Sequence, residues 1–260
     1  MSEPAPHVEV QPAATVMLVR DAGDGPDGSL EVLMLRRHPE SVFAADAWVF
    51  PGGRVDDADG LDVPIGAGPS DEEASRALGL PAGGRAYWVA AARECFEEAG
   101  ILLARHADSG AWLDTTAFDG SRRPCQGDTP CPPGEWSAAR LARYRRDVHA
   151  GAISLGGVLE AEGLVLDLSG VHYVSHWITP PHRGTARRFD TRFFVAEVPP
   201  SQIVSHDAAE TVESVWTTPA EALARGAEGE IVLLVPTIAN LKALTGVSSV
   251  AEIVESVCPT

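Results

Sequence analysis

The sequence predicts a single α+β domain, and three observations support this prediction. Short apolar runs rich in β-branched residues, which favour strands, occur in both halves of the chain, and those at 13–19 and 31–36 flank an Asp/Gly-rich turn typical of a hairpin. Residues 86–104 are rich in Ala, Arg and Glu and contain no Gly or Pro before Gly100, which favours a helix. No internal repeat or linker-like segment divides the 260 residues, so one decorated domain is the simplest organisation.

The remaining elements are predicted from shorter patterns. Ser70, with Glu73 three residues later, has the signature of a helix N-cap. Further strands are expected at 171–178, 191–198 and 211–216, and further helices at 135–150, 153–159, 219–225 and 237–244. Residues 48–50 lead into a glycine corner, and the terminal segment 250–257 is apolar enough to pack against the domain. The Pro-rich segment 1–12 is expected to be a flexible tail ahead of a domain that covers 13–260.

The composition is that of an ordinary globular protein, and it narrows the range of partners. Hydrophobic residues make up 45% and charged residues 22%, and no apolar run approaches the roughly 18 residues that a membrane span needs. The formal charge of −17 argues against a nucleic-acid polymer, because binding many phosphates needs a basic surface, but it allows a small phosphorylated substrate bridged by divalent cations. The N-terminus has no basic and apolar signal sequence, so a cytoplasmic location is expected. Whether the chain is a monomer or a homodimer stays open.

The four cysteines do not suggest a disulfide framework in a chain of this size. Cys125 and Cys131 lie in a Pro/Gly-rich segment, but a structural zinc site would need two more ligands, and none lies nearby in the sequence. We therefore expect ordinary thiols there.

The expected helix at 86–104 carries the residues that suggest chemistry. Glu94, Glu97 and Glu98 stand at i, i+3 and i+4, which places three carboxylates on one helix face. Such carboxylates repel one another, and Arg93 offsets part of the cost because it lies four residues before Glu97. The arrangement becomes favourable if Mg²⁺, which prefers oxygen ligands, binds among them. The alternative is a solvated acidic face, which is common on exposed helices.

Two motifs shift the balance towards a site: Phe50-Pro51-Gly52-Gly53 and Arg93-Glu94-Cys95-Phe96-Glu97-Glu98-Ala99-Gly100-Ile101. Together they resemble the box of the Nudix hydrolases, in which a glycine, five residues, a glutamate and seven residues precede Arg-Glu-aliphatic-x-Glu-Glu-x-Gly-aliphatic. Cys95 takes the aliphatic position. The resemblance implies a Nudix fold, in which a mixed sheet is sandwiched between helices, with insertions here at about 57–84 and 105–165.

The box departs from the family pattern at its first acid. Five residues after Gly53 comes Asp59 rather than glutamate, and about 26 extra residues separate it from Arg93. Either Asp59 does the work of the missing glutamate, or the acid lies after the insertion, where Glu72 and Glu73 are candidates, or it is absent.

An interrupted box resembles the Nudix branch that includes the peroxisomal CoA diphosphatases of animals and many bacterial relatives. Three further segments are similar to that branch: Trp177-Ile178-Thr179-Pro180, Arg188-Phe189-Asp190-Thr191-Arg192-Phe193-Phe194 and Glu213-Ser214-Val215-Trp216. The CoA motif that other Nudix CoA hydrolases carry just upstream of the glycines is not evident. The substrate therefore stays open between CoA or acyl-CoA and ADP-ribose, NADH or dinucleotides, and a Nudix-fold module that senses a nucleotide without cleaving it is the alternative to an enzyme.

The resemblance implies that water attacks a pyrophosphate phosphorus with the help of Mg²⁺ or Mn²⁺. It implies Glu97, Glu98 and the Gly53 carbonyl as cation ligands, Glu94 as a further ligand or the group that orients the water, and Arg93 as an orienting residue.

Residues outside the box supply the remaining candidates. Glu210 and Glu213 are candidate general bases, with His206 and Asp207 as alternatives. The candidate substrate phosphate contacts are arginines: Arg36, Arg37, Arg187 and Arg188, with Arg183 and Arg192 in the same cluster. Ion pairing with the many carboxylates is the alternative role for each of these arginines. Trp48, Phe189 and Trp216 could stack on an adenine or pack in the core.

Overall fold

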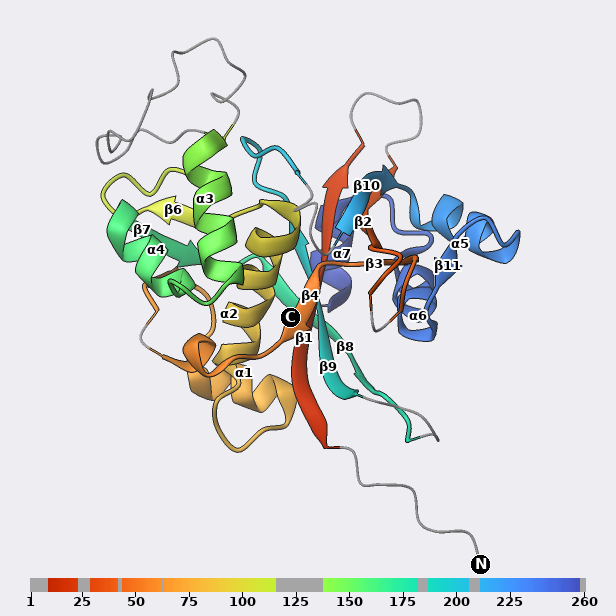
Figure 1. Ribbon diagram of the computed structural model, residues 1–260, viewed down its shortest axis with the longest axis horizontal. Helices are drawn as coiled ribbons and strands as arrows, with labels where there is room; N and C mark the ends of the chain where they lie inside the picture. Colours follow the sequence, from red (N-terminus) through yellow and green to blue (C-terminus); the bar gives the residue numbers. More distant parts are fainter. Residues whose placement is uncertain are drawn as a thin grey trace, which may run out of the picture.

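An eight-stranded mixed sheet lies at the centre of the computed structural model, which describes residues 9–22, 29–41, 44–61, 63–115, 138–181, 187–205 and 211–257 (Figure 1). Its strands are β1 (Val10–Asp21), β2 (Leu30–Arg37), β3 (Ala47–Val49), β4 (Gly52–Arg54), β8 (Val171–Ile178), β9 (Arg188–Glu197), β10 (Thr211–Thr217) and β11 (Val232–Leu233). Strand β1 pairs in parallel with β9 from Val10 to Val19, and antiparallel with β2 near the turn between them. The expected hairpin is therefore confirmed.

A split between β1 and β2 positions the glycine motif. The two strands pair from Val19 to Asp21 and then separate, so each offers a free edge to a short strand. Strand β4 pairs with β1, where Gly53 lies opposite Ala14. Strand β3 pairs with β2, where Val49 lies opposite Leu35. The Val16 N–H donates to the carbonyl oxygen of Pro51 at 2.8 Å, which fixes the corner between β3 and β4.

Helices cover both faces of the sheet, as Figure 1 shows. One face of β1, with Ala14, Val16 and Leu18, packs against helices from the first two thirds of the chain: α1 (Asp71–Leu78), α2 (Arg85–Glu94), α3 (Ala138–His149) and α4 (Leu155–Glu162). The other face, with Met17 and Val19, packs against C-terminal helices: α5 (Pro219–Ala227), α6 (Val235–Leu244) and α7 (Val250–Val257). The alternation follows from the two-residue period of a strand. The predicted α+β fold with a mixed sheet between helices is confirmed.

A second, three-stranded sheet joins the two expected insertions. Strand β7 (Leu164–Asp167) lies in the middle, paired in parallel with β5 (Ile65–Ala67) and antiparallel with β6 (Ala104–His106). None of these three strands was predicted from the sequence, because three or four residues are too few to display a period.

Two predicted boundaries are wrong. The helix expected to run to residue 104 ends at Gly100, whose φ of 71° is left-handed and terminates the helix. Its last turn, η2 (Cys95–Ala99), is a π-helix that continues directly from α2. Strand β1 already begins at Val10, so the expected tail 1–12 is too long by three residues. Within the described residues no helix is long and apolar enough to cross a bilayer.

Candidate active site

The three box glutamates are buried at the junction of α2 and η2. Glu94 and Glu97 are each 8% exposed and Glu98 is 3% exposed, which rules out the solvated acidic face. Buried carboxylates need partners, because transfer out of water costs several kcal/mol per charge. The partners come from the glycine corner, from Arg93 and from an element of the second insertion.

The glycine corner meets Glu94 and Glu98 directly. The Gly52 N–H donates to Glu98 Oε2 at 3.1 Å. A Cβ on Gly53 would lie 2.4 Å from Glu94 Oε1, so no other residue fits there without displacing that carboxylate. A Cβ on Gly52 would lie 2.7 Å from the Ala14 carbonyl oxygen, which is the close approach of β4 to β1. The structure therefore brings together the two motifs that the sequence separates by some forty residues.

Arg93 links the cluster, and all five of its N–H donors find acceptors. Its Nε and one Nη2 hydrogen donate to the two carboxylate oxygens of Asp59 at 2.9 and 3.1 Å. Nη1 donates to Glu94 and Glu97, each at 2.8 Å, and Nη2 also donates to the Arg54 carbonyl at 2.6 Å. Burial opposes the charge, but the hydrogen bonds and the carboxylate charges outweigh it and raise the pKa of Arg93. The guanidinium therefore stays charged and fixes two box glutamates.

Of the three acids considered for the first position of the box, Asp59 is the one that pairs with Arg93. It lies in a short 3-10 turn, η1 (Asp57–Gly60), and is 3% exposed. Its Oδ2 also accepts from the Asp56 N–H at 2.8 Å, which closes the turn. Burial raises the pKa of Asp59, and the hydrogen bonds from Arg93 offset part of that rise. The other candidates have different partners: Glu72 pairs with Arg76 on the surface of α1, and Glu73 caps that helix through Ser70.

Helix α3 places two residues against Glu97 that were not predicted from the sequence. His149 Nδ1 lies 3.3 Å from Glu97 Oε2, and buried Arg145 contacts the Glu97 carbonyl group. Their four-residue spacing puts both on one helix face, but nothing in the sequence relates that face to the box. A cavity of about 180 Å³ opens beside Glu97, between the first insertion, the box helix and the turn from α3 to α4; its lining includes Asp59, Arg93, His149, Ile153 and Leu155.

Several other expected residues have identified partners. Arg36 pairs with Asp46 at 3.0 Å and with Glu213 at 3.5 Å across the β2–β10 ladder. Arg188 Nε donates to the Thr179 carbonyl at 2.9 Å, while Arg187 is exposed. Trp48 is 5% exposed and belongs to the core, so it is not available for stacking.

Arg37 differs from these arginines. Its Nε is buried and has no hydrogen-bond partner within the part of the chain that the structure describes. Six expected residues lie outside the described residues: Cys125, Cys131, Arg183, His206, Asp207 and Glu210.

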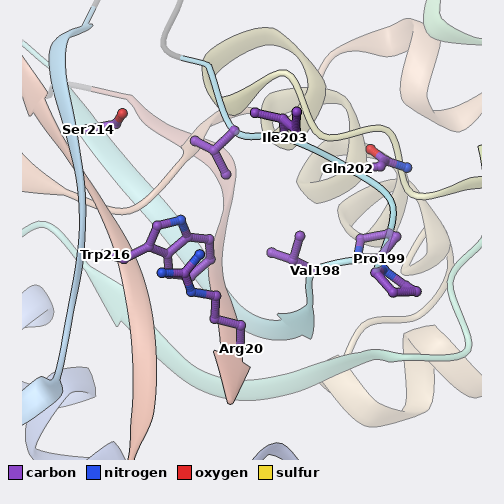
Figure 2. Close-up of a pocket in the computed structure, with 9 residues that line it drawn as sticks. Arg20, Val198, Pro199, Gln202, Ile203, Ser214 and Trp216 are labelled. Carbon is purple, nitrogen blue, oxygen red and sulfur yellow. The ribbon is translucent and has the colours of Figure 1, made fainter. Parts of the chain in front are cut away.

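A pocket of about 360 Å³ lies on the box-helix side of the sheet, and Figure 2 shows the side chains that line it. Trp216 forms one wall, with the Arg20 guanidinium 4.3 Å from its ring centre, and Val198 and Ile203 lie across the gap. None of the lining residues that the structure describes is acidic. The segment that carries Val198 and Ile203 continues to Ser205, whose N–H donates to the Ala99 carbonyl at 2.9 Å, so this pocket is connected to the end of the box helix.

The oxygen atoms of the box glutamates are the kind of ligand that a hard divalent cation prefers. Glu94, Glu97 and Glu98 offer carboxylate oxygens beside a glycine whose missing side chain leaves its backbone accessible to them. Within the described residues, however, no group of three or more Asp, Glu, His or Cys side chains is already arranged as a cation site. Both Glu97 oxygens instead face Arg93 and His149.

A family model described as the NUDT19 Nudix domain matches residues 67–244, which include the whole Arg-Glu-x-x-Glu-Glu segment. The chain belongs to the Nudix hydrolases. Among its curated relatives are the acyl-coenzyme A diphosphatases NUDT19 of Gallus gallus, 32% identical over 253 residues, and of Homo sapiens, 30% identical over 256 residues. These alignments cover 86% and 88% of this chain but 63% and 64% of the relatives, so the chain spans less than two thirds of their length.

A crystal structure of a Nudix hydrolase from Alicyclobacillus acidocaldarius is similar over nearly the whole fold. It is 28% identical, with a TM-score of 0.69, and the superposition covers 97% of this chain and 100% of that one. The family model begins after Gly53 and Asp59, so for this Nudix hydrolase their part in the box rests on the geometry given above.

Proposed function

We propose that this Nudix hydrolase cleaves the pyrophosphate of a nucleoside-diphosphate-linked substrate in a reaction that depends on Mg²⁺ or Mn²⁺, and that CoA or acyl-CoA is the substrate to test first. The observation that carries the proposal is the buried convergence of Glu94 and Glu98 on the Gly52-Gly53 corner. The choice of CoA is supported by the curated relatives, which are named acyl-coenzyme A diphosphatases.

The residues divide the work as follows. Glu97, Glu98 and the Gly53 carbonyl would hold the cation, and Glu94 would complete the set or orient the attacking water. A bound divalent cation neutralises phosphate charge and lowers the pKa of a coordinated water. Arg93 binds Glu94 and Glu97 through one nitrogen, Nη1, and Asp59 through Nε and Nη2, so it acts on the orientation of the two glutamates rather than on the substrate.

The general base and the phosphate contacts come from residues outside the box. Glu210 and Glu213 remain the candidate bases, and Glu213 would have to exchange its contact with Arg36. Among the proposed phosphate contacts Arg36, Arg37, Arg187 and Arg188, we favour Arg37, because its buried Nε has no acceptor in the described residues. For an adenine, the Trp216 pocket offers an aromatic wall, a volume of about 360 Å³ and, among the residues placed by the structure, no acidic side chain in its lining.

One observation favours a nucleotide sensor as the second candidate. Arg93 and His149 engage both oxygens of Glu97, and no ready-made trio of acids surrounds a cation position in the described residues. A cation must therefore rearrange these contacts before catalysis. A sensor would keep them and bind a nucleotide without hydrolysis.

Mass spectrometry of reaction products separates the two functions. The chain would be incubated with Mg²⁺ or Mn²⁺ and, in separate reactions, with CoA, an acyl-CoA, ADP-ribose, NADH and diadenosine polyphosphates. We expect two phosphorylated products from at least one substrate, with CoA or acyl-CoA the most active, and no products in EDTA. Tight nucleotide binding without turnover of any substrate would instead establish the sensor.

A further inference from the structure

Arg145 is a buried arginine on α3, within the second insertion and outside the box. It is 8% exposed. Its Nη2 and Nε donate to the backbone carbonyl oxygen of Glu97 at 2.8 and 3.2 Å, and its Nη1 donates to Ser205 Oγ at 2.9 Å. One guanidinium thus joins the insertion, the box helix and the segment that leads to β10.

The Glu97 carbonyl needs a donor from outside the helix. The last carbonyl groups of a helix have no partner within it. The two N–H groups that would reach Glu97 in a continuing helix are used elsewhere: Ile101 donates to the Cys95 carbonyl and Leu102 donates to Gln202 Oε1. Arg145 supplies the donors, and its positive charge also favours the negative end of the helix dipole.

Gly100 makes room for this contact. A Cβ at Gly100 would lie 2.7 Å from Ser205 Oγ and 3.1 Å from Arg145 Nη1. The box glycine therefore has two functions here. Its left-handed φ of 71° ends the helix, and its missing side chain admits the guanidinium of Arg145.

The same helix face also reaches the Glu97 side chain. His149, one turn after Arg145, lies 3.3 Å from Glu97 Oε2, while Arg93 holds Oε1. Glu97 is therefore fixed at its backbone from α3 and at its carboxylate from both sides. A shift of the helix end would move Glu97 and Glu98 together relative to Gly52 and Gly53.

We propose that Arg145 is a positioning residue that fixes the end of the box helix and thereby sets the cation affinity of the Glu97–Glu98 pair. The inference rests on the proposed function, since it takes these glutamates to be cation ligands. Its effect is on cation binding and kcat rather than on substrate affinity. The second insertion would then contribute to cation binding, because it supplies the arginine that fixes the end of the box helix.

The test compares three variants on the full chain. Arg145→Met removes every hydrogen-bond donor of the side chain but keeps a long, unbranched chain. Arg145→Lys keeps the positive charge but loses the planar guanidinium that donates through three nitrogens. Arg146→Met is the matched control, because Arg146 is the next residue of α3 and is exposed. Mn²⁺ binding is measured without substrate by electron paramagnetic resonance, kcat and KM are measured with CoA, and the fold is checked by circular dichroism.

We expect Arg145→Met to weaken Mn²⁺ binding and lower kcat by roughly 10–100-fold, the usual effect of losing a partner that orients a ligand. KM should change little, Arg145→Lys should recover part of both losses, and Arg146→Met should match the wild type. Wild-type Mn²⁺ affinity in a folded Arg145→Met protein would overturn the proposal. If that variant does not fold, wild-type Mn²⁺ affinity and kcat in Arg145→Lys would do so.

Failure of the proposed function gives a different result. A wild-type chain that binds Mn²⁺ in an Arg145-dependent way but cleaves nothing would remove the function and leave the positioning role intact. A wild-type chain that hydrolyses CoA while Arg145→Met binds Mn²⁺ and turns over equally well would leave the function and remove the role of Arg145.

Discussion

Arg93 and Asp59 lie 34 positions apart in the sequence and form a two-point ion pair beside the box glutamates. The pair shows how the residues on either side of the insertion in the box come together. The chain leaves the sheet after β4, forms η1 with Asp59, continues through β5 and α1, and returns as α2, so that the acid in η1 meets the arginine near the end of α2.

Removing the Asp59 carboxylate should destabilise the protein strongly. Asp59→Ala leaves two buried Arg93 donors without acceptors, and breaking a buried pair on one side typically costs about 3–5 kcal/mol. Urea denaturation followed by fluorescence measures the free energy of unfolding. Asp57→Ala, on the exposed side of the same turn, is the control and should lie within about 0.5 kcal/mol of the wild type.

The same experiment tests whether Glu72 contributes to the buried cluster around Arg93. Glu72→Ala should resemble the control, because Glu72 lies on the surface and its exposed ion pair with Arg76 contributes little. A large loss of stability in Glu72→Ala, together with wild-type stability in Asp59→Ala, would show that Arg93 does not depend on Asp59.

Replacing Glu98 should remove turnover without unfolding the chain. Glu98→Gln keeps the volume and an acceptor for the Gly52 N–H but loses the charge that a cation needs. We expect kcat to fall by at least about a hundredfold, since even an outer partner of a ligand typically contributes 10–100-fold. Steady-state kinetics at saturating Mg²⁺ measure the loss, with Glu160→Gln, an exposed change on α4, as the control. Near wild-type kcat in Glu98→Gln would remove Glu98 from the site.

Local patterns predicted the parts of this site that depend on neighbours in the sequence. The spacing of Glu94, Glu97 and Glu98 fixes their common face on any helix, and Ser70 with Glu73 forms the expected capping box. The end of the helix at Gly100 was also available as a signal, because a glycine commonly ends a helix. The apolar residues 101–104 that follow it are all buried in the core, and their apolar pattern is compatible with a longer helix.

The remaining features depend on contacts between distant segments. Whether Asp59, Glu72 or Glu73 would meet Arg93 is set by the path of the insertion, which no local periodicity encodes. Arg145 and His149 gave only the pattern of an ordinary helix, and their role appears when α3 packs on η2. Arg36 and Glu213 were expected near the substrate, but the register of β2 and β10 pairs them with each other.

A side chain at Gly53 should disturb Glu94 directly. In Gly53→Ala the new methyl group would lie 2.4 Å from Glu94 Oε1, so the carboxylate has to move away from the corner. We expect a loss of about 1–3 kcal/mol of stability from overpacking and a larger proportional loss of kcat. Gly170→Ala is the control, because its Cβ would have nothing within 4 Å. Unchanged kcat in Gly53→Ala would mean that Glu94 does not need its position against the glycine.

The start of the box helix should contribute a pH-dependent part of the stability. The Asp71 carboxylate accepts hydrogen bonds from the N–H groups of Arg85 and Gly83, each at 3.0 Å, and these bonds hold the pKa of Asp71 below its ordinary value of 3.8. A lowered pKa in the folded state stabilises the protein above the unfolded value, and this contribution disappears as the pH falls through the folded value. Asp71→Ala should therefore lose about 1 kcal/mol at pH 7, the usual effect of removing a helix cap.

The difference between wild type and Asp71→Ala should shrink as the pH falls below 3.8, because protonation removes the acceptor from the wild type as well. Urea denaturation curves from pH 7 to pH 2.5 measure that difference. The control is Asp108→Ala, which changes an exposed aspartate and should leave the curve unchanged. A difference that stays constant down to pH 2.5 would mean that Asp71 stabilises α2 through packing rather than through its charge. The hydrogen bonds of its carboxylate to Gly83 and Arg85 would then not help to anchor the helix that carries Glu94.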